Sequence, residues 1–147
     1  MSHEINLVGR WDIVSWEQRY DDGRCELPMG TQLEGFIRYL PDGDMVCMIC
    51  RVPRQPFQKG GQWNAPDEEK AGAYNTMLSY AGRYTVDGDV LTHNVEMSLF
   101  PNWIGGTQKR RLEVRPDGTL ALSARLEDNT PQARTALLVW RRHGSQN

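Results

Sequence analysis

The chain has 147 residues, with 17 Lys and Arg against 19 Asp and Glu, and its formal net charge is −2. This length fits one domain, residues 1–147, and 13 aromatic residues (five Trp, five Tyr and three Phe) can fill a core. The near-neutral charge argues against nucleic acid as a partner, because general nucleic-acid binders carry a basic excess. The sequence has no apolar run of roughly 18 residues and no signal-peptide pattern, so we expect a cytoplasmic protein without a membrane partner.

The three cysteines, Cys25, Cys47 and Cys50, are too few and odd in number for a disulfide framework. Cys47 and Cys50 have the C-x-x-C spacing of zinc and redox sites, but they lie in an apolar run that we interpret as a strand. Residues three apart in a strand point to opposite faces and cannot share a metal. We therefore expect small buried side chains here, no metal and no cofactor.

The hydrophobic pattern predicts eight strands, at residues 8–19, 34–40, 44–51, 82–86, 89–99, 106–115, 119–124 and 134–142. Three tight turns, Pro41-Asp42-Gly43, Asp87-Gly88 and Pro116-Asp117-Gly118, join strands as β-hairpins. One helix is predicted near residues 66–80, with Pro66 in its first turn. Its apolar stripe would contain Ala71, Tyr74, Met77, Leu78 and Ala81.

In an up-and-down sheet these three hairpins lie at one end. The long segments, at 20–33, 52–81, 100–105 and 125–133, then lie at the other. Eight such strands close into a barrel with room for one small ligand. The prediction is an all-β protein: an eight-stranded antiparallel up-and-down β-barrel, with the helix near 66–80 over the open end.

Several motifs connect this chain with a known family. The G-x-W motif that opens lipocalins is present in Leu7-Val8-Gly9-Arg10-Trp11. In lipocalins an arginine of the last strand lies across this tryptophan, and the run Val139-Trp140-Arg141-Arg142 supplies such an arginine. With Tyr80–Tyr84 and Ser98–Trp103, the chain resembles the small bacterial and fungal lipocalin-like domain family over roughly residues 5–142. The resemblance implies a calycin-type barrel with an internal cavity. Related barrels bind hydrophobic molecules or act as isomerases, hydratases or cyclases.

We assign Trp11 and Arg141 to the closed base of this barrel. Alternation along residues 89–99 places Leu91, His93, Val95, Met97 and Leu99 on the interior face. A two-residue loop at Asp87-Gly88 would set Tyr84 opposite Leu91 and Gly82 opposite His93. The turn at residues 41–43 would set Tyr39 opposite Met45 and Ile37 opposite Cys47.

Gln108 and Arg110 share the interior face of the next strand with Leu112 and Val114. A loop centred near residues 102–103 would set Val95 opposite Arg110, making Arg110 a diagonal neighbour of His93. An unpaired guanidinium in a cavity can hold a carboxylate, enolate or carbonyl oxygen. The alternative is a structural salt bridge between Arg110 and Glu17, and the sequence does not decide between the two.

The candidate ligand-binding residues are the aromatic and polar side chains on these faces and at the rim: Tyr39, Tyr74, Tyr84, His93, Met97, Trp103, Gln108 and Arg110. The first functional hypothesis is a barrel that binds a small hydrophobic or amphipathic molecule, aromatic or polycyclic and bearing oxygen. The second is a cofactor-independent isomerase or cyclase with His93 as proton shuttle and Arg110 stabilising an enolate-like oxygen. The third is an interaction domain whose barrel is filled by its own side chains. A homodimer is compatible with the sequence.

Overall fold

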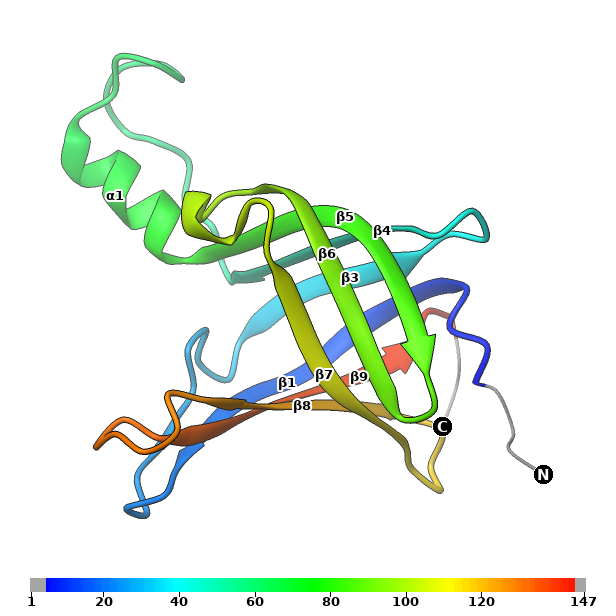
Figure 1. Ribbon diagram of the computed structural model, residues 1–147. Helices are drawn as coiled ribbons and strands as arrows, with labels where there is room; N and C mark the ends of the chain where they lie inside the picture. The colour runs from blue at the N-terminus through cyan, green and yellow to red at the C-terminus, as the bar shows by residue number, and fades with distance from the viewer. Residues whose placement is uncertain (1–4, 145–147) are drawn as a thin grey trace.

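Eight long antiparallel strands form the wall of a closed barrel in the computed structural model, which describes residues 5–144 (Figure 1). Their order follows the sequence, and pairing of the first with the last closes the sheet. The strands are β1 (Gly9–Tyr20), β3 (Leu33–Tyr39), β4 (Asp44–Arg51), β5 (Met77–Asp87), β6 (Val90–Ser98), β7 (Thr107–Val114), β8 (Leu120–Leu126) and β9 (Arg134–Arg142). The predicted eight-stranded up-and-down barrel is confirmed.

The two ends of the barrel differ. The hairpins β3–β4, β5–β6 and β7–β8 turn at one end, and the longer segments lie at the other (Figure 1). Two short elements belong to these segments: the two-residue strand β2 (Cys25–Glu26), which pairs with β1, and the 3₁₀-helix η1 (Pro101–Trp103). The β3–β4 register confirms the predicted pairs Tyr39 with Met45 and Ile37 with Cys47.

The pairing around β1 is uneven. Its ladder with β9 runs from Trp11 to Tyr20, whereas its ladder with β3 covers only Gly9–Asp12 against Phe36–Tyr39. Beyond Asp12, no ladder pairs join β1 to β3 in the described part of the chain.

The hairpin end is closed by the tryptophan of the G-x-W motif. The Trp11 indole N–H donates a hydrogen bond of 3.0 Å to the Leu7 carbonyl. The Arg142 guanidinium lies over the indole, 4.2 Å from the ring centroid, and donates to the carbonyls of Val8 and Asn6. Of the two arginines in the last-strand motif, Arg142 therefore covers Trp11, and the assignment of Arg141 to the closed base is corrected to Arg142, because the β1–β9 register sets Trp11 opposite Arg142.

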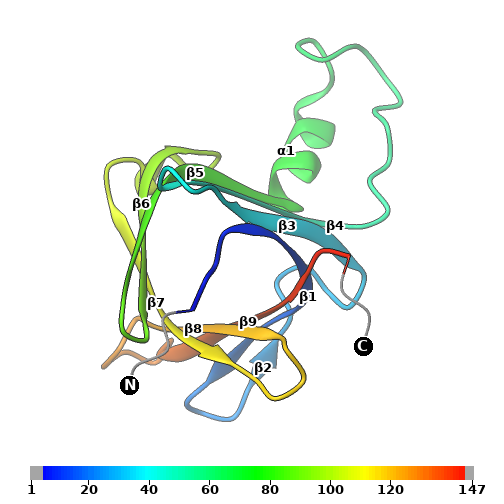
Figure 2. The same cartoon turned by 90° about the vertical axis from the view of Figure 1, so that its right-hand side faces the viewer.

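The helix is shorter than predicted. α1 spans Asp67–Asn75, and β5 begins at Met77, so Met77, Leu78 and Ala81 of the predicted apolar stripe belong to a strand. No residue of α1 is buried, and Figure 2 shows the helix beyond the β4–β5 side of the barrel. Within residues 5–144, none of the helices has the length and apolar character needed to cross a bilayer.

Two β-bulges exchange the inward and outward faces of their strands. In β1 the extra residue is Val14, so that Trp16 and Gln18 face inward beyond it, and Glu17 faces outward. In β6 the extra residue is Glu96, between the pairs Gly82–Val95 and Ala81–Met97. The predicted interior position of Met97 is therefore wrong: its side chain is 73% exposed.

Candidate functional site

A cavity of about 380 Å³ lies inside the barrel towards the end with the long loops, where Phe100 and Trp103 of the β6–β7 segment line it. Its volume falls within the roughly 300–1,000 Å³ typical of small-molecule sites. Apolar and aromatic side chains from several strands form most of its wall: Trp16, Ile37, Cys47, Leu78, Tyr80, Phe100, Trp103, Leu122, Leu126, Ala136, Leu138 and Trp140. The polar lining is Gln18, His93, Gln108, Arg110 and Arg134. The expectation of a barrel filled by its own side chains does not fit this space.

His93 occupies the middle of β6 on the interior face, but its neighbours differ from those expected. It pairs with Tyr84 on β5 and Gln108 on β7, whereas Tyr84 was expected opposite Leu91. The register differs because the β5–β6 turn is centred on Gly88-Asp89, with Asp87 paired to Val90. Arg110 pairs with Leu91 instead of Val95, which still leaves it diagonal to His93.

Two tyrosine hydroxyls hold the His93 ring in place. The Tyr39 hydroxyl lies 2.8 Å from Nε2 and the Tyr80 hydroxyl lies 2.8 Å from Nδ1. Burial of the ring, which is 1% exposed, and the nearby Arg110 charge lower the pKa of His93 to about 3. The ring is therefore neutral near pH 7 and has both nitrogens occupied, which does not suit the expected proton shuttle.

Arg110 is half-buried, and its hydrogen-bond partners among the described residues are neutral. Its guanidinium donates to the Lys109 carbonyl at 3.1 Å and to Gln108 Oε1 at 3.0 Å. The alternative pair with Glu17 is wrong, because the bulge turns Glu17 to the outer surface, where it pairs with Arg19 at 2.9 Å. No carboxylate of residues 5–144 forms an ion pair with Arg110.

Aromatic rings form the wall between this polar cluster and the loop end. Trp103 of η1 meets Tyr80 edge-to-face, with ring centroids 5.7 Å apart, and Phe100 contacts Trp103 in the same manner at 5.6 Å. Tyr80 was not among the predicted site residues, because it was placed at the end of the helix. The alternation of Leu78, Tyr80, Gly82 and Tyr84 is the strand signal that identifies its inward direction.

The structure separates the eight predicted ligand-binding residues into three groups. His93, Trp103, Gln108 and Arg110 line the cavity. Tyr39 and Tyr84 are not part of its lining: they contact each other at 4.7 Å between centroids, and the Tyr84 hydroxyl donates to the Leu40 carbonyl. Tyr74 and Met97 lie outside the barrel, 44% and 73% exposed.

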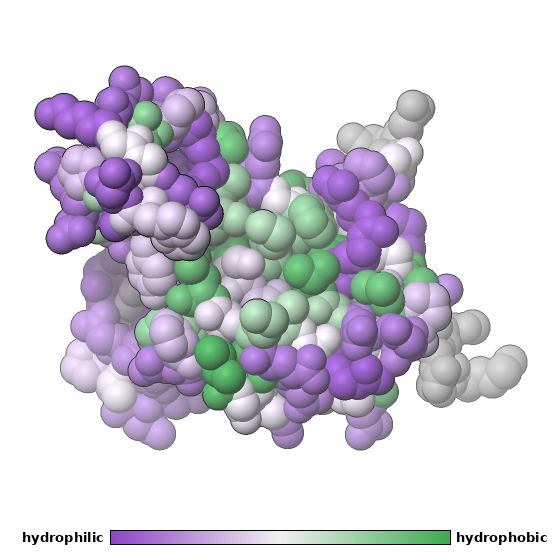
Figure 3. Space-filling model, turned by 90° about the horizontal axis from the view of Figure 1, so that it is seen from above, coloured by the Kyte–Doolittle hydropathy of each residue, from purple (hydrophilic) through white to green (hydrophobic). Residues whose placement is uncertain are grey.

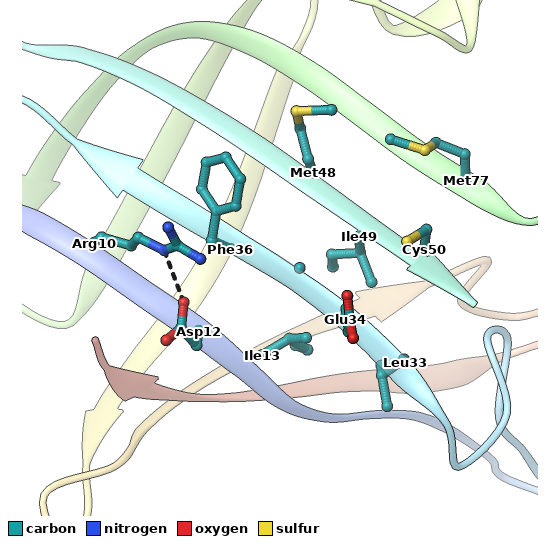
Figure 4. A pocket seen from close by; sticks show the side chains of 11 residues that line it. Arg10, Asp12, Ile13, Leu33, Glu34, Phe36, Met48, Ile49, Cys50 and Met77 are labelled. Atoms are coloured by element: carbon teal, nitrogen blue, oxygen red, sulfur yellow. Dashed lines mark hydrogen bonds and ion pairs between the residues drawn. The ribbon is translucent and has the colours of Figure 1, made fainter. Parts of the chain in front are cut away.

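A second hollow lies on the outer face of β1, β3, β4 and β5 (Figure 4). Its floor contains Phe36 and Met48, and Figure 3 shows apolar side chains gathered across the face that carries β4 and β5. Arg10 lies over the Phe36 ring at 4.6 Å and pairs with Asp12 at 2.8 Å. The charge of Arg10 already has a partner, and the hollow is open to solvent. The interior cavity is therefore the stronger ligand-site candidate.

A family model described as "Lipocalin-like domain" matches residues 8–143. The chain belongs to this family. A protein of Aspergillus oryzae named "4'-hydroxy-3'-methoxypropiophenone carrier protein ppsC" is 39% identical over 74 residues, an alignment that covers 44% of this chain and 67% of that protein. A solved structure of an uncharacterized Bacteroides eggerthii protein is similar at 13% identity, with a TM-score of 0.46, covering 94% of this chain and 100% of the other.

Proposed function

We propose that this lipocalin-like protein binds and carries a small aromatic molecule that bears oxygen, inside its barrel. One observation carries the proposal: a single cavity combines aromatic walls with the unpaired Arg110 guanidinium and the polar groups of His93 and Gln108. Small-molecule sites typically have mostly apolar walls and a few polar groups that fix orientation. The name of the Aspergillus oryzae relative gives an aryl ketone of this kind as that protein's cargo.

A carrier releases its ligand unchanged, and the neutral, doubly hydrogen-bonded His93 agrees with that role. Isomerisation or cyclisation would need a group that exchanges protons near neutral pH. The pKa of His93, lowered to about 3, does not provide one.

The test is a binding titration with 4'-hydroxy-3'-methoxypropiophenone, followed by tryptophan fluorescence. Three tryptophans line the cavity, Trp16, Trp103 and Trp140, so a bound aryl ketone should quench their emission. We expect saturable binding with a Kd on the order of 1 μM, about −8 kcal/mol. Chromatography and mass spectrometry after incubation should recover the ketone unchanged.

Two variants separate binding in the cavity from binding elsewhere. Ala136→Phe adds bulk to a buried lining residue and should abolish quenching. Arg111→Leu changes the exposed neighbour of Arg110, which faces outward near Asp89, and should bind as the unmodified protein does. Equal quenching in both variants would refute the interior site, and a ketone recovered in altered form would refute the carrier role.

A further inference from the structure

The charges that line the cavity have one sign. Among residues 5–144, its lining contains two arginines, Arg110 and Arg134, and no Asp or Glu, although the chain has more acidic than basic residues. Arg134 is neutralised by an ion pair with Glu127. Arg110, whose hydrogen bonds go to neutral oxygens, leaves one positive charge without a partner among the described residues. A half-buried, unpaired guanidinium is unfavourable until an anion joins it.

Tyr80 can add a hydrogen-bond donor at the same place. A neutral imidazole has one donor and one acceptor nitrogen, so one of the two tyrosines that contact His93 accepts a hydrogen bond from the ring. When Tyr39 donates to Nε2, Nδ1–H donates to Tyr80, and the Tyr80 hydroxyl proton can turn to the Cys47 sulfur beside it or to a ligand oxygen in the cavity. Tyr80 lines the cavity and Tyr39 does not, so this arrangement gives the cavity a further donor.

Three other donors belong to the lining residues. The buried indole nitrogens of Trp16 and Trp140, and Nε of Arg134, have no hydrogen-bond partner in the described part of the chain. Buried polar groups normally have partners, so their lack of one is unusual. Together with Arg110 and Tyr80, these groups make the cavity rich in donors, and none of the described residues adds a carboxylate to its lining.

We propose that the cavity holds its ligand as an oxyanion: a phenol made acidic by conjugation with a carbonyl group, bound as its phenolate against Arg110 and Tyr80. The inference deepens the proposed function and rests on it. On binding, the phenol O–H bond breaks, its electron pair stays on oxygen and the proton passes to solvent. A guanidinium stabilises such an oxygen more strongly in a cavity than in water, since the dielectric screening is weaker.

Titration of the protein's own groups would not obscure a pH dependence of ligand affinity near neutral pH. The titratable or charged groups that line the cavity are Cys47, Tyr80, His93, Arg110 and Arg134, and Tyr39 contacts His93 from outside the lining. Burial raises the pKa of Cys47 to about 12 and those of Tyr39 and Tyr80 well above their usual value, while the pKa of His93 is about 3. A pH dependence of affinity near neutrality would therefore report the ionisation of the ligand.

The experiment compares 4'-hydroxy-3'-methoxypropiophenone with its 4'-O-methyl ether, which cannot ionise. Absorbance distinguishes bound phenol from bound phenolate, because the conjugated phenolate absorbs at longer wavelength. We expect the phenolate spectrum at pH values where the free ligand is still a phenol, with the ligand pKa lowered on binding by about one unit or more, a preference of about tenfold. The affinity should rise with pH up to the pKa of the free ligand and then level off, and the ether should bind at least about tenfold more weakly.

Three variants assign the effect to Arg110. Arg110→Leu should remove the spectral shift and the pH dependence, whereas Arg110→Lys should retain much of both by keeping the charge. Arg111→Leu should retain both in full. A bound ligand with the neutral-phenol spectrum and a pH-independent affinity, or an ether that binds equally well, would overturn the inference while leaving the carrier function standing. Failure of both compounds to bind would contradict the carrier function and, with it, this inference.

Discussion

Gly82 on β5 lies directly against the backbone carbonyl of Asn94 on β6. A Cβ added at Gly82 would stand 1.9 Å from that oxygen and 3.0 Å from the nitrogen of Glu96, the extra residue of the β6 bulge. Both neighbours are backbone atoms of a strand and cannot move aside as a flexible side chain would. The close approach of β5 and β6 at the bulge therefore depends on the absence of a side chain at Gly82.

We expect Gly82→Ala to lower the free energy of unfolding by about 3 kcal/mol or more, because the methyl group must displace β6. Gly72→Ala is the matched control: a Cβ at this helical glycine meets nothing within 4 Å. It should leave the barrel unchanged or slightly stabilise it. Urea unfolding measures both, and equal stabilities would show that β6 tolerates the methyl group.

Acid should destabilise the barrel through His93. The pKa of His93 is about 3 in the folded protein against 6.5 in the unfolded chain, so the unfolded state binds more protons between these values. The contribution of neutral His93 to the free energy of unfolding is complete above pH 6.5 and is lost as the pH falls towards 3. Between about pH 7 and pH 5 the loss is about 2 kcal/mol. Unfolding of the wild type and His93→Gln at both pH values checks this, since the variant should lose less, and equal losses would contradict it.

Substitutions of the two tyrosines that hold His93 should have similar effects on stability and different effects on ligand binding. Tyr39→Phe and Tyr80→Phe each leave one buried ring nitrogen without its partner, and each should cost about 1–3 kcal/mol of stability. Only Tyr80 lines the cavity, so only Tyr80→Phe should weaken binding of the aryl ketone, by about tenfold. Thermal unfolding and the fluorescence titration measure the two effects, and equal affinities in the two variants would rule out Tyr80 as a ligand donor.

Arg142 and Arg141 are adjacent, but they should differ in their effect on stability. Arg142→Ala removes the guanidinium over Trp11 and two hydrogen bonds to backbone carbonyls, so we expect a loss of about 1–2 kcal/mol. Arg141→Ala is the matched control and should cost less, because Arg141 pairs with Asp12 and not with Trp11 in the β1–β9 ladder. Chemical denaturation of both variants decides the matter, and a larger loss for Arg141→Ala would contradict the assignment.

Glu17 tests the position of the β1 bulge. Since Glu17 faces outward and pairs with Arg19, Glu17→Gln should leave the affinity for the aryl ketone unchanged. Had Glu17 been the partner of Arg110, removing its charge would free the guanidinium and change the affinity markedly.

Local patterns of the sequence were sufficient to predict the eight strands and the cavity-facing positions of His93, Gln108 and Arg110. Alternation fails beyond a bulge, because one extra residue exchanges the two faces of a strand without altering the composition. For this reason Met97 was predicted inside and lies outside. Tyr80 was missed because the helix, predicted to residue 80, gives way to β5 at Met77.

The ladder between β1 and β3 has only four pairs, at Gly9–Asp12 and Phe36–Tyr39, and leaves a weakly paired seam in the barrel wall between the rest of these two strands. Along β1 and β9 the ladder has nine pairs, so the two neighbours of β1 hold it with unequal strength. We expect backbone amides of Leu33–Gly35 to exchange with deuterium sooner than those at the β1–β9 junction, through local opening that leaves the remaining wall intact. Along this part of the wall, the backbone amides of β3 would then exchange with solvent as those of an edge strand in an open sheet do.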